Sequence, residues 1–178
     1  MEVPTAGSSP IVPTKAGEKS TSHRLMFGVR LAGGNGFEFI VPYMTSPAGW
    51  CGADTCSKRS AIFGDLELTF APTGGIEIVA GVRYGFEANS LGEHDIVIRP
   101  GIIGYLDESS NFKIFLILQA LIEITGRLNV GGAPGLGLQY DFMPYFGMFL
   151  QLQASFMALE VVRFEANASF GVQGRIGG

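Results

Sequence analysis

The feature that most constrains this chain is a two-residue alternation of apolar and polar side chains in two long segments. In residues 76–87 an apolar series alternates with a series that includes Glu77, Arg83 and Glu87. Residues 163–176 repeat the pattern, with Arg163, Glu165 and Arg175 on the polar side. Successive side chains of a β-strand point to opposite faces. Each segment therefore predicts a strand with one apolar and one charged face.

Such strands can close a barrel in either of two ways. A soluble barrel encloses its apolar face, whereas a barrel in lipid turns that face outward and keeps polar groups inside. Composition favours the barrel in lipid, because only 16% of residues are charged, the mean hydropathy is +0.29 and there are 26 glycines. The most apolar segment, 114–124, is interrupted by Gln119 and Glu123, so no stretch reaches the ~18 to 20 residues of a spanning helix. The sequence therefore predicts an all-β, antiparallel up-and-down transmembrane barrel.

Strand count and loop lengths support this prediction. Strand-like runs occupy residues 24–32, 37–43, 60–71, 76–87, 95–106, 112–123, 135–142, 146–157 and 163–176. The first two share one parity and merge across Gly33–Gly36 into one strand, which gives eight strands rather than nine. Short connections at 72–75, 107–111 and 143–145 alternate with longer ones at 45–59, 88–94 and 124–134. Short turns at one end and long loops at the other are typical of outer-membrane barrels.

Aromatic residues near the strand ends predict two belts at the membrane interfaces. One belt would lie beside the short turns, and we expect it to contain Phe70, Tyr105, Phe112, Phe142, Tyr145 and Phe146. The other would contain Tyr43, Trp50, Phe86, Phe156 and Phe164.

By these patterns residues 24–176 resemble the small eight-stranded outer-membrane barrels of Gram-negative bacteria, the OmpA/OmpX-like group. The last strand, 169–176, resembles the group's terminal assembly signal only loosely, since it ends in Ile176 with Gly174 two residues earlier. The resemblance implies a location in the bacterial outer membrane. We expect residues 1–23, rich in Pro, Ser, Thr and Gly, to form a disordered tail, and residues 24–178 to form the barrel.

If the apolar face is outside, charges of both signs line the interior. The expected network consists of Glu67, Glu77, Arg83, Arg99, Asp141, Arg163, Glu165 and Arg175. An eight-stranded barrel is just wide enough for side chains to fill it, so we expect these groups to pair and pack. The alternative is a selective conducting path.

The loop at 45–59 is the longest connection and contains both cysteines. Cys51 and Cys56 are spaced for a small disulfide ring in an oxidising compartment. Zinc is disfavoured, since the histidines at 23 and 94 are distant, and we expect no metal or cofactor. Trp50, Lys58 and Arg59 are the candidate contact residues of this loop.

We predict a structural or interaction role through the extracellular loops, without catalysis. The expected partners are the lipid bilayer or lipopolysaccharide, and a protein bound through loops 45–59 and 124–134. A net charge of −4 and a pI near 5.1 disfavour nucleic acid. His94 beside Asp95 could form a base with its orienting carboxylate, but the chain has no matching motif of a lipid-modifying enzyme. A small pore and a soluble lipocalin-like carrier of an apolar ligand remain as alternatives.

Overall fold

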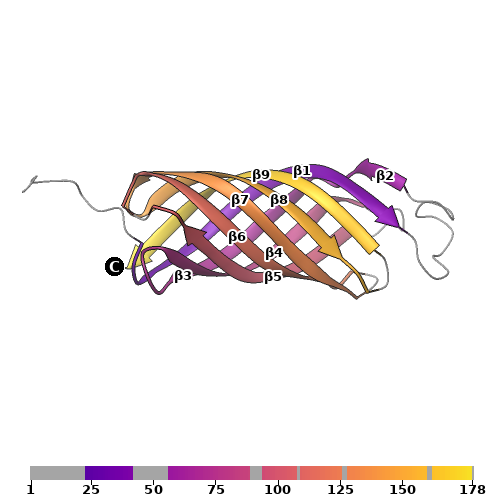
Figure 1. Cartoon of the computed structure of the whole chain (residues 1–178), viewed down its shortest axis with the longest axis horizontal. Coiled ribbons are helices and arrows are strands. Elements are labelled where there is room, and N and C mark those ends of the chain that lie inside the picture. Colours follow the sequence, from indigo (N-terminus) through magenta and orange to yellow (C-terminus); the bar gives the residue numbers. More distant parts are fainter. Residues whose placement is uncertain are drawn as a thin grey trace, which may run out of the picture.

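The chain forms an antiparallel barrel (Figure 1). The computed structural model describes residues 23–41, 56–88, 94–107, 109–125, 128–159 and 162–177. Its strands are β1 (Met26–Val41), β2 (Cys56–Arg59), β3 (Phe63–Ala71), β4 (Ile76–Ala88), β5 (His94–Tyr105), β6 (Phe112–Glu123), β7 (Asn129–Met143), β8 (Phe146–Met157) and β9 (Val162–Gly177). The described part of the chain contains no helix with the length and apolar character of a membrane-spanning segment.

The barrel closes because the first and last long strands pair. Each strand from β3 to β9 pairs with its neighbour in sequence, and β1 pairs with both β3 and β9. The β1–β9 pairing runs from Met26 opposite Gly177 to Val41 opposite Val162. Eight strands, β1 and β3 to β9, thus form the wall, and β1 is continuous through Gly33–Gly36. The predictions of one merged first strand and of an eight-stranded up-and-down barrel are confirmed.

Strand β2 continues β3 along the edge of β1 beyond a one-residue bulge. Gly34 pairs with Phe63, and Phe37 pairs with Arg59. Between these two pairs β1 advances by three residues and the segment from β2 to β3 by four, which is a one-residue bulge. The backbone N–H of Ser60, within this step, donates to Gly36 O at 2.9 Å. The predicted loop at 45–59 is therefore wrong in its last four residues, because residues 56–59 form a strand that pairs with β1.

The expected loop at 124–134 is also too long. Strand β7 begins at Asn129, which pairs with Glu123, and the ladder continues through Gly131 opposite Leu121. Glycine suits this stretch, because a Cβ at Gly131 would lie 1.9 Å from Phe156 O on β8. The close approach of two strands, rather than loop flexibility, explains this glycine.

The large apolar side chains of the wall point outward. Examples are Phe27, Leu68, Leu118 and Phe170, whose exposed fractions lie between 52% and 61%. The soluble carrier with apolar residues inside is therefore wrong: the alternation has the polarity of a barrel in lipid.

Aromatic residues lie on the outside near both ends of the barrel, with one exception. Phe112, Phe142, Tyr145 and Phe146 are exposed beside the short turns, and Phe86, Phe156 and Phe164 are exposed towards the other end. Tyr105 was placed in the first belt, and this is wrong: it is 8% exposed and lies inside. The two-residue period explains this, because Tyr105 shares the parity of buried Ile103, not that of exposed Ile102. Tyr43 and Trp50 lie outside the described residues.

Candidate functional site: the barrel interior and its outer mouth

At the short-turn end, the interior is closed by an ion-pair cluster around Asp141 that we call the inner network. Its members are His23, Glu77, Lys113, Asp141, Gln173 and Arg175. Asp141 on β7 lies 2.5 Å from Lys113 Nζ and 3.2 Å from Arg175 Nη1. Asp141 and Lys113 have fully buried side chains, so their charges are stabilised by one another rather than by water.

His23 joins this inner network from the segment before β1. Its Nδ1 lies 3.1 Å from Glu77 Oε1 and its Nε2 lies 2.8 Å from Asp141 Oδ2. The side chain is completely buried and its ring meets the Tyr105 ring edge-on at 5.3 Å. Residues 1–22 of the expected tail lie outside the described residues, whereas His23 is part of the barrel interior.

Next along the barrel comes an apolar layer of Val79, Ile103, Tyr105, Phe115, Ile117 and Phe149. Strand β6 shows the order directly, since its inward positions from the short-turn end begin with Lys113, Phe115 and Ile117. Phe115 and Phe149 are 0% and 3% exposed, and their ring centroids are 6.5 Å apart. On β4 and β6 this layer lies between the inner-network residues Glu77 and Lys113 and the buried polar residues nearer the outer end, Arg83 and Gln119.

A second cluster, the central network, lies on the outer side of the apolar layer. The Arg30 guanidinium lies 3.9 Å from the centre of the Phe149 ring and donates to Glu67 at 2.9 Å. Gln119 donates to Glu67 at 2.8 Å and accepts from Arg99 at 2.6 Å. Arg99 also donates to Gln153 and, at 2.5 Å, to Asp65. Five strands, β1, β3, β5, β6 and β8, thus contribute to a continuous chain of charge-assisted hydrogen bonds.

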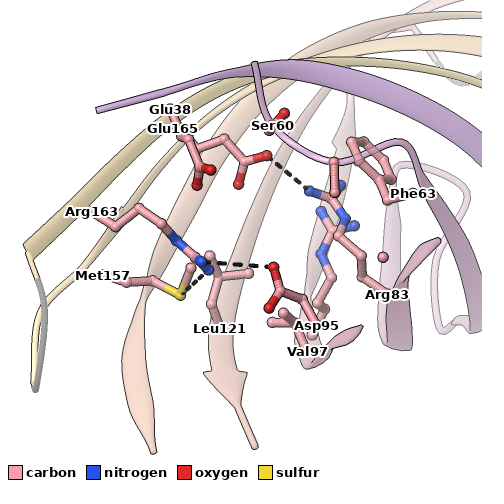
Figure 2. A pocket seen from close by; sticks show the side chains of 13 residues that line it. Glu38, Ser60, Phe63, Arg83, Asp95, Val97, Leu121, Met157, Arg163 and Glu165 are labelled. Carbon is pink, nitrogen blue, oxygen red and sulfur yellow. Dashed lines mark hydrogen bonds and ion pairs between the residues drawn. The ribbon is translucent and has the colours of Figure 1, made fainter. Parts of the chain in front are cut away.

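The outer mouth, at the long-loop end, contains a cavity lined by Arg83 and Arg163 from opposite sides (Figure 2). Arg83 donates two hydrogen bonds to Asp65, at 2.8 and 3.0 Å, and its guanidinium lies 3.5 Å from the centre of the Phe63 ring. Arg163 donates to both oxygens of Glu123, at 3.3 and 3.2 Å. Glu165 lies 4.0 Å from Arg83.

The eight interior charges expected from the sequence fall into three places. Glu77, Asp141 and Arg175 meet in the inner network, Glu67 and Arg99 in the central network, and Arg83, Arg163 and Glu165 at the outer mouth. Seven are at most 9% exposed, and the Glu165 side chain is 11% exposed. They do not form one cluster, because the apolar layer lies between the first group and the others.

The candidate loop residues are described only in part. Arg59 on β2 is exposed and donates to Glu87 on β4 at 2.6 Å. Trp50 and Cys51 lie outside the described residues, as do the side chains of Cys56 and Lys58. The predicted disulfide stays a prediction.

His94 is not arranged as a base with Asp95. Its Nδ1 donates to Gly85 O at 3.0 Å, and its ring stacks on Tyr84 at 5.4 Å. Asp95 lies 4.0 Å from Arg163.

Sequence reasoning missed His23, Ser60 and the apolar layer. The signal for the layer was present, because Phe115 and Ile117 share the parity of Lys113, Gln119 and Glu123 on β6. For His23 no local signal exists, since its partners Glu77 and Asp141 are 54 and 118 residues away along the chain.

Comparison with known proteins supports the architecture. No protein-family model matches the chain, and no match was found among curated proteins. Among solved structures, Neisserial surface protein A (NspA) aligns with a TM-score of 0.62 at 12% identity, over 84% of this chain and 97% of its own. The N-terminal barrel domain of Pseudomonas aeruginosa OprF gives a TM-score of 0.59 at 11% identity, covering 84% and 98%.

A third similar structure is Ail, the attachment invasion locus protein of Yersinia pestis. It aligns with a TM-score of 0.52 at 11% identity, over 86% of this chain and 99% of its own. The alignments span nearly all of each of the three structures, although the sequences have diverged. The chain has the fold of the small eight-stranded outer-membrane β-barrels.

Proposed function

We propose that this protein is a closed barrel of the bacterial outer membrane, without catalytic activity, that presents its outer-end loops to partners at the cell surface. The observation on which this depends is the filled interior. The inner network, the apolar layer and the central network occupy successive levels, and the layer's six side chains are at most 8% exposed. Such packing leaves no continuous polar path for ions.

The shape of the outer end supports a role in presentation. Strands β9, β1 and β2 pair side by side at the rim, with Phe39 opposite Phe164 on one edge and Ser57 on the other. Figure 1 shows β2 and the end of β1 at the outer extremity of the drawn strands. Phe37 and Phe39 are 66% and 51% exposed on this extension. The strands on either side of residues 42–55, β1 and β2, are therefore both paired at the rim.

The pore alternative predicts measurable ion conduction. We expect planar-bilayer recordings of the refolded protein to show no discrete conductance steps above the lipid background. The matched test variant is Phe115→Ala/Phe149→Ala, which empties part of the apolar layer. Discrete, reproducible steps in the wild-type protein would show that the closed-barrel proposal is wrong.

Lipopolysaccharide is the proposed surface partner of the outer end, through Lys58 and Arg59. Lysine and arginine bind phosphate groups through charge-assisted hydrogen bonds. We expect saturable binding of lipopolysaccharide to the detergent-refolded protein, weakened severalfold in a Lys58→Ala/Arg59→Ala variant. Arg24→Ala removes a cation at the opposite end and is the control. Equal affinity in the double variant and the wild-type protein would restrict the proposal to a structural role.

The disulfide between Cys51 and Cys56 remains part of this proposal. It would close a small ring next to β2 and restrict the conformations of the loop. Mass spectrometry of unreduced peptides from protein isolated from the outer membrane should show the two cysteines linked. Free thiols at both positions would remove the ring from the proposal.

A further inference from the structure

The outer mouth contains a cavity of about 40 Å³ that the ion pairs do not fill. One wall is apolar and is formed by Phe63, Val97, Leu121 and Met157, all at most 5% exposed. Glu38, Ser60, Asp95 and Glu165 line it elsewhere, together with the arginines (Figure 2). A water-sized group needs at least roughly 10–15 Å³. The cavity therefore has room for a small head group with an adjoining methylene.

Negative charge exceeds positive charge around this cavity. Three lining carboxylates face three lining guanidinium groups, and two further carboxylates, Asp65 and Glu123, hydrogen-bond to those arginines. With every group ionised, five negative and three positive charges leave a net charge of −2. A field of this sign attracts cations and repels anions.

Three lining residues have a buried polar atom without a hydrogen-bond partner among the described residues. The Ser60 Oγ, on a side chain that is 4% exposed, can accept a hydrogen bond, whereas the Nε–H groups of Arg99 and Arg163, 1% and 6% exposed, can only donate one. A buried polar atom without a partner costs roughly 1–3 kcal/mol. The Ser60 Oγ therefore marks a place for a ligand that donates a hydrogen bond, whereas the two Nε–H groups need an acceptor such as water. Glu165 adds an acceptor, because its 4.0 Å distance to Arg83 exceeds hydrogen-bonding range.

We propose that the outer mouth binds the primary ammonium group of a small alkylamine. The ammonium offers three N–H donors, of which Glu165 and Ser60 accept two, while its methylenes contact Val97, Leu121 and Met157. A metal ion fits less well, because the described residues contain no group of three or more side chains able to hold one. The net negative charge disfavours a phosphate or carboxylate ligand.

The test is a calorimetric titration of the full chain, refolded in detergent micelles, with n-butylammonium and 1,4-diaminobutane at low salt. We expect saturable binding with one site per barrel. Tetramethylammonium has the charge but no N–H donor, and 1-butanol has the alkyl chain but no charge. Both should bind at least tenfold more weakly. Equal binding of tetramethylammonium would show general charge attraction and overturn the proposal, and so would the absence of saturable binding by either amine.

Variants locate the site. Glu165→Gln and Ser60→Ala should each weaken amine binding, the former about tenfold, which corresponds to ~1.4 kcal/mol. Glu87→Gln removes the same charge from an exposed residue outside the cavity and should keep wild-type affinity. If Glu165→Gln fails to refold, Ser60→Ala decides the test, because it changes no charge. Equal weakening in Glu87→Gln, or none in Ser60→Ala, would place the binding elsewhere.

Discussion

At the scale of single residues, Asp141 shows how a buried carboxylate stabilises the barrel interior. It lies within 3.2 Å of His23, Lys113 and Arg175, and its side chain is fully buried. Removing one partner from a buried ion pair leaves the other charge without compensation, at a cost of about 3–5 kcal/mol. Asp141→Asn should lower the free energy of unfolding by that amount in urea titrations of the detergent-refolded protein. Asp107→Asn, in an exposed turn, is the matched control: asparagine keeps the Oδ1 acceptor for Ser109, so the loss should be much smaller than for Asp141→Asn. Equal losses would contradict this account.

Asp107 itself should titrate abnormally, in the turn between β5 and β6. The hydroxyl of Ser109 donates to its Oδ1 at 2.9 Å and the Ser109 backbone N–H donates at 3.0 Å, and these bonds lower the pKa of the carboxyl. The pKa of Asp107 is lower in the folded chain than in the unfolded chain. Ionised Asp107 therefore stabilises the fold at pH values above its unfolded-state pKa, and this stabilisation is lost as the pH falls through its folded-state pKa. A carbon-detected NMR titration should show this low pKa, and Ser109→Ala should move it upward. An unchanged titration in the variant would rule out the hydroxyl as a cause.

At the scale of elements, the spacing between strand β7 and its neighbours depends on Gly137. A Cβ at this position would lie 2.2 Å from Phe115 Cζ and 2.6 Å from Leu150 O. Gly137→Ala should therefore displace the Phe115 ring from the apolar layer and lower the free energy of unfolding by roughly 1–3 kcal/mol. Gly104→Ala, where a Cβ meets nothing within 4 Å, should unfold like the wild-type protein in the same urea titration. Comparable losses at the two positions would show that the missing space does not explain the role of Gly137, because the entropic effect of Gly→Ala is stabilising.

The boundaries of the elements were the least predictable from sequence. The period of two located the long strands and the joined β1, because alternation reports directly which side chains share a face. It did not reveal β2 or the start of β7 at Asn129, since the short β2 segment and the glycine-rich start of β7 lack a clear alternation. These segments are strands because β1, β6 and β8 offer them backbone partners.

At the scale of the whole molecule, the outward apolar surface should make folding depend on a lipid-like solvent. The barrel exposes large apolar side chains around its wall, and water disfavours so much apolar surface. We expect β-structure by circular dichroism, and a mobility difference between unheated and boiled samples on gels, only when detergent micelles are present. Assembly of a monodisperse folded species in plain buffer would contradict the membrane polarity of the barrel.

The sequence by itself determined that the chain makes long two-faced strands, that these close a barrel, and that charges of both signs line its interior. Side-chain direction alternates along a strand whatever its partners are, so the two faces of each strand are a local property. Closure follows because strands in lipid need a partner on both edges. Only the tertiary structure decided which charges meet. His23 reaches Glu77 and Asp141, and Arg30 contacts Phe149 and Glu67, through closure and register. Alternation and short turns constrain the register of neighbouring strands. The pairing of β1 with β9 joins segments far apart along the chain, and only the closed barrel sets its register.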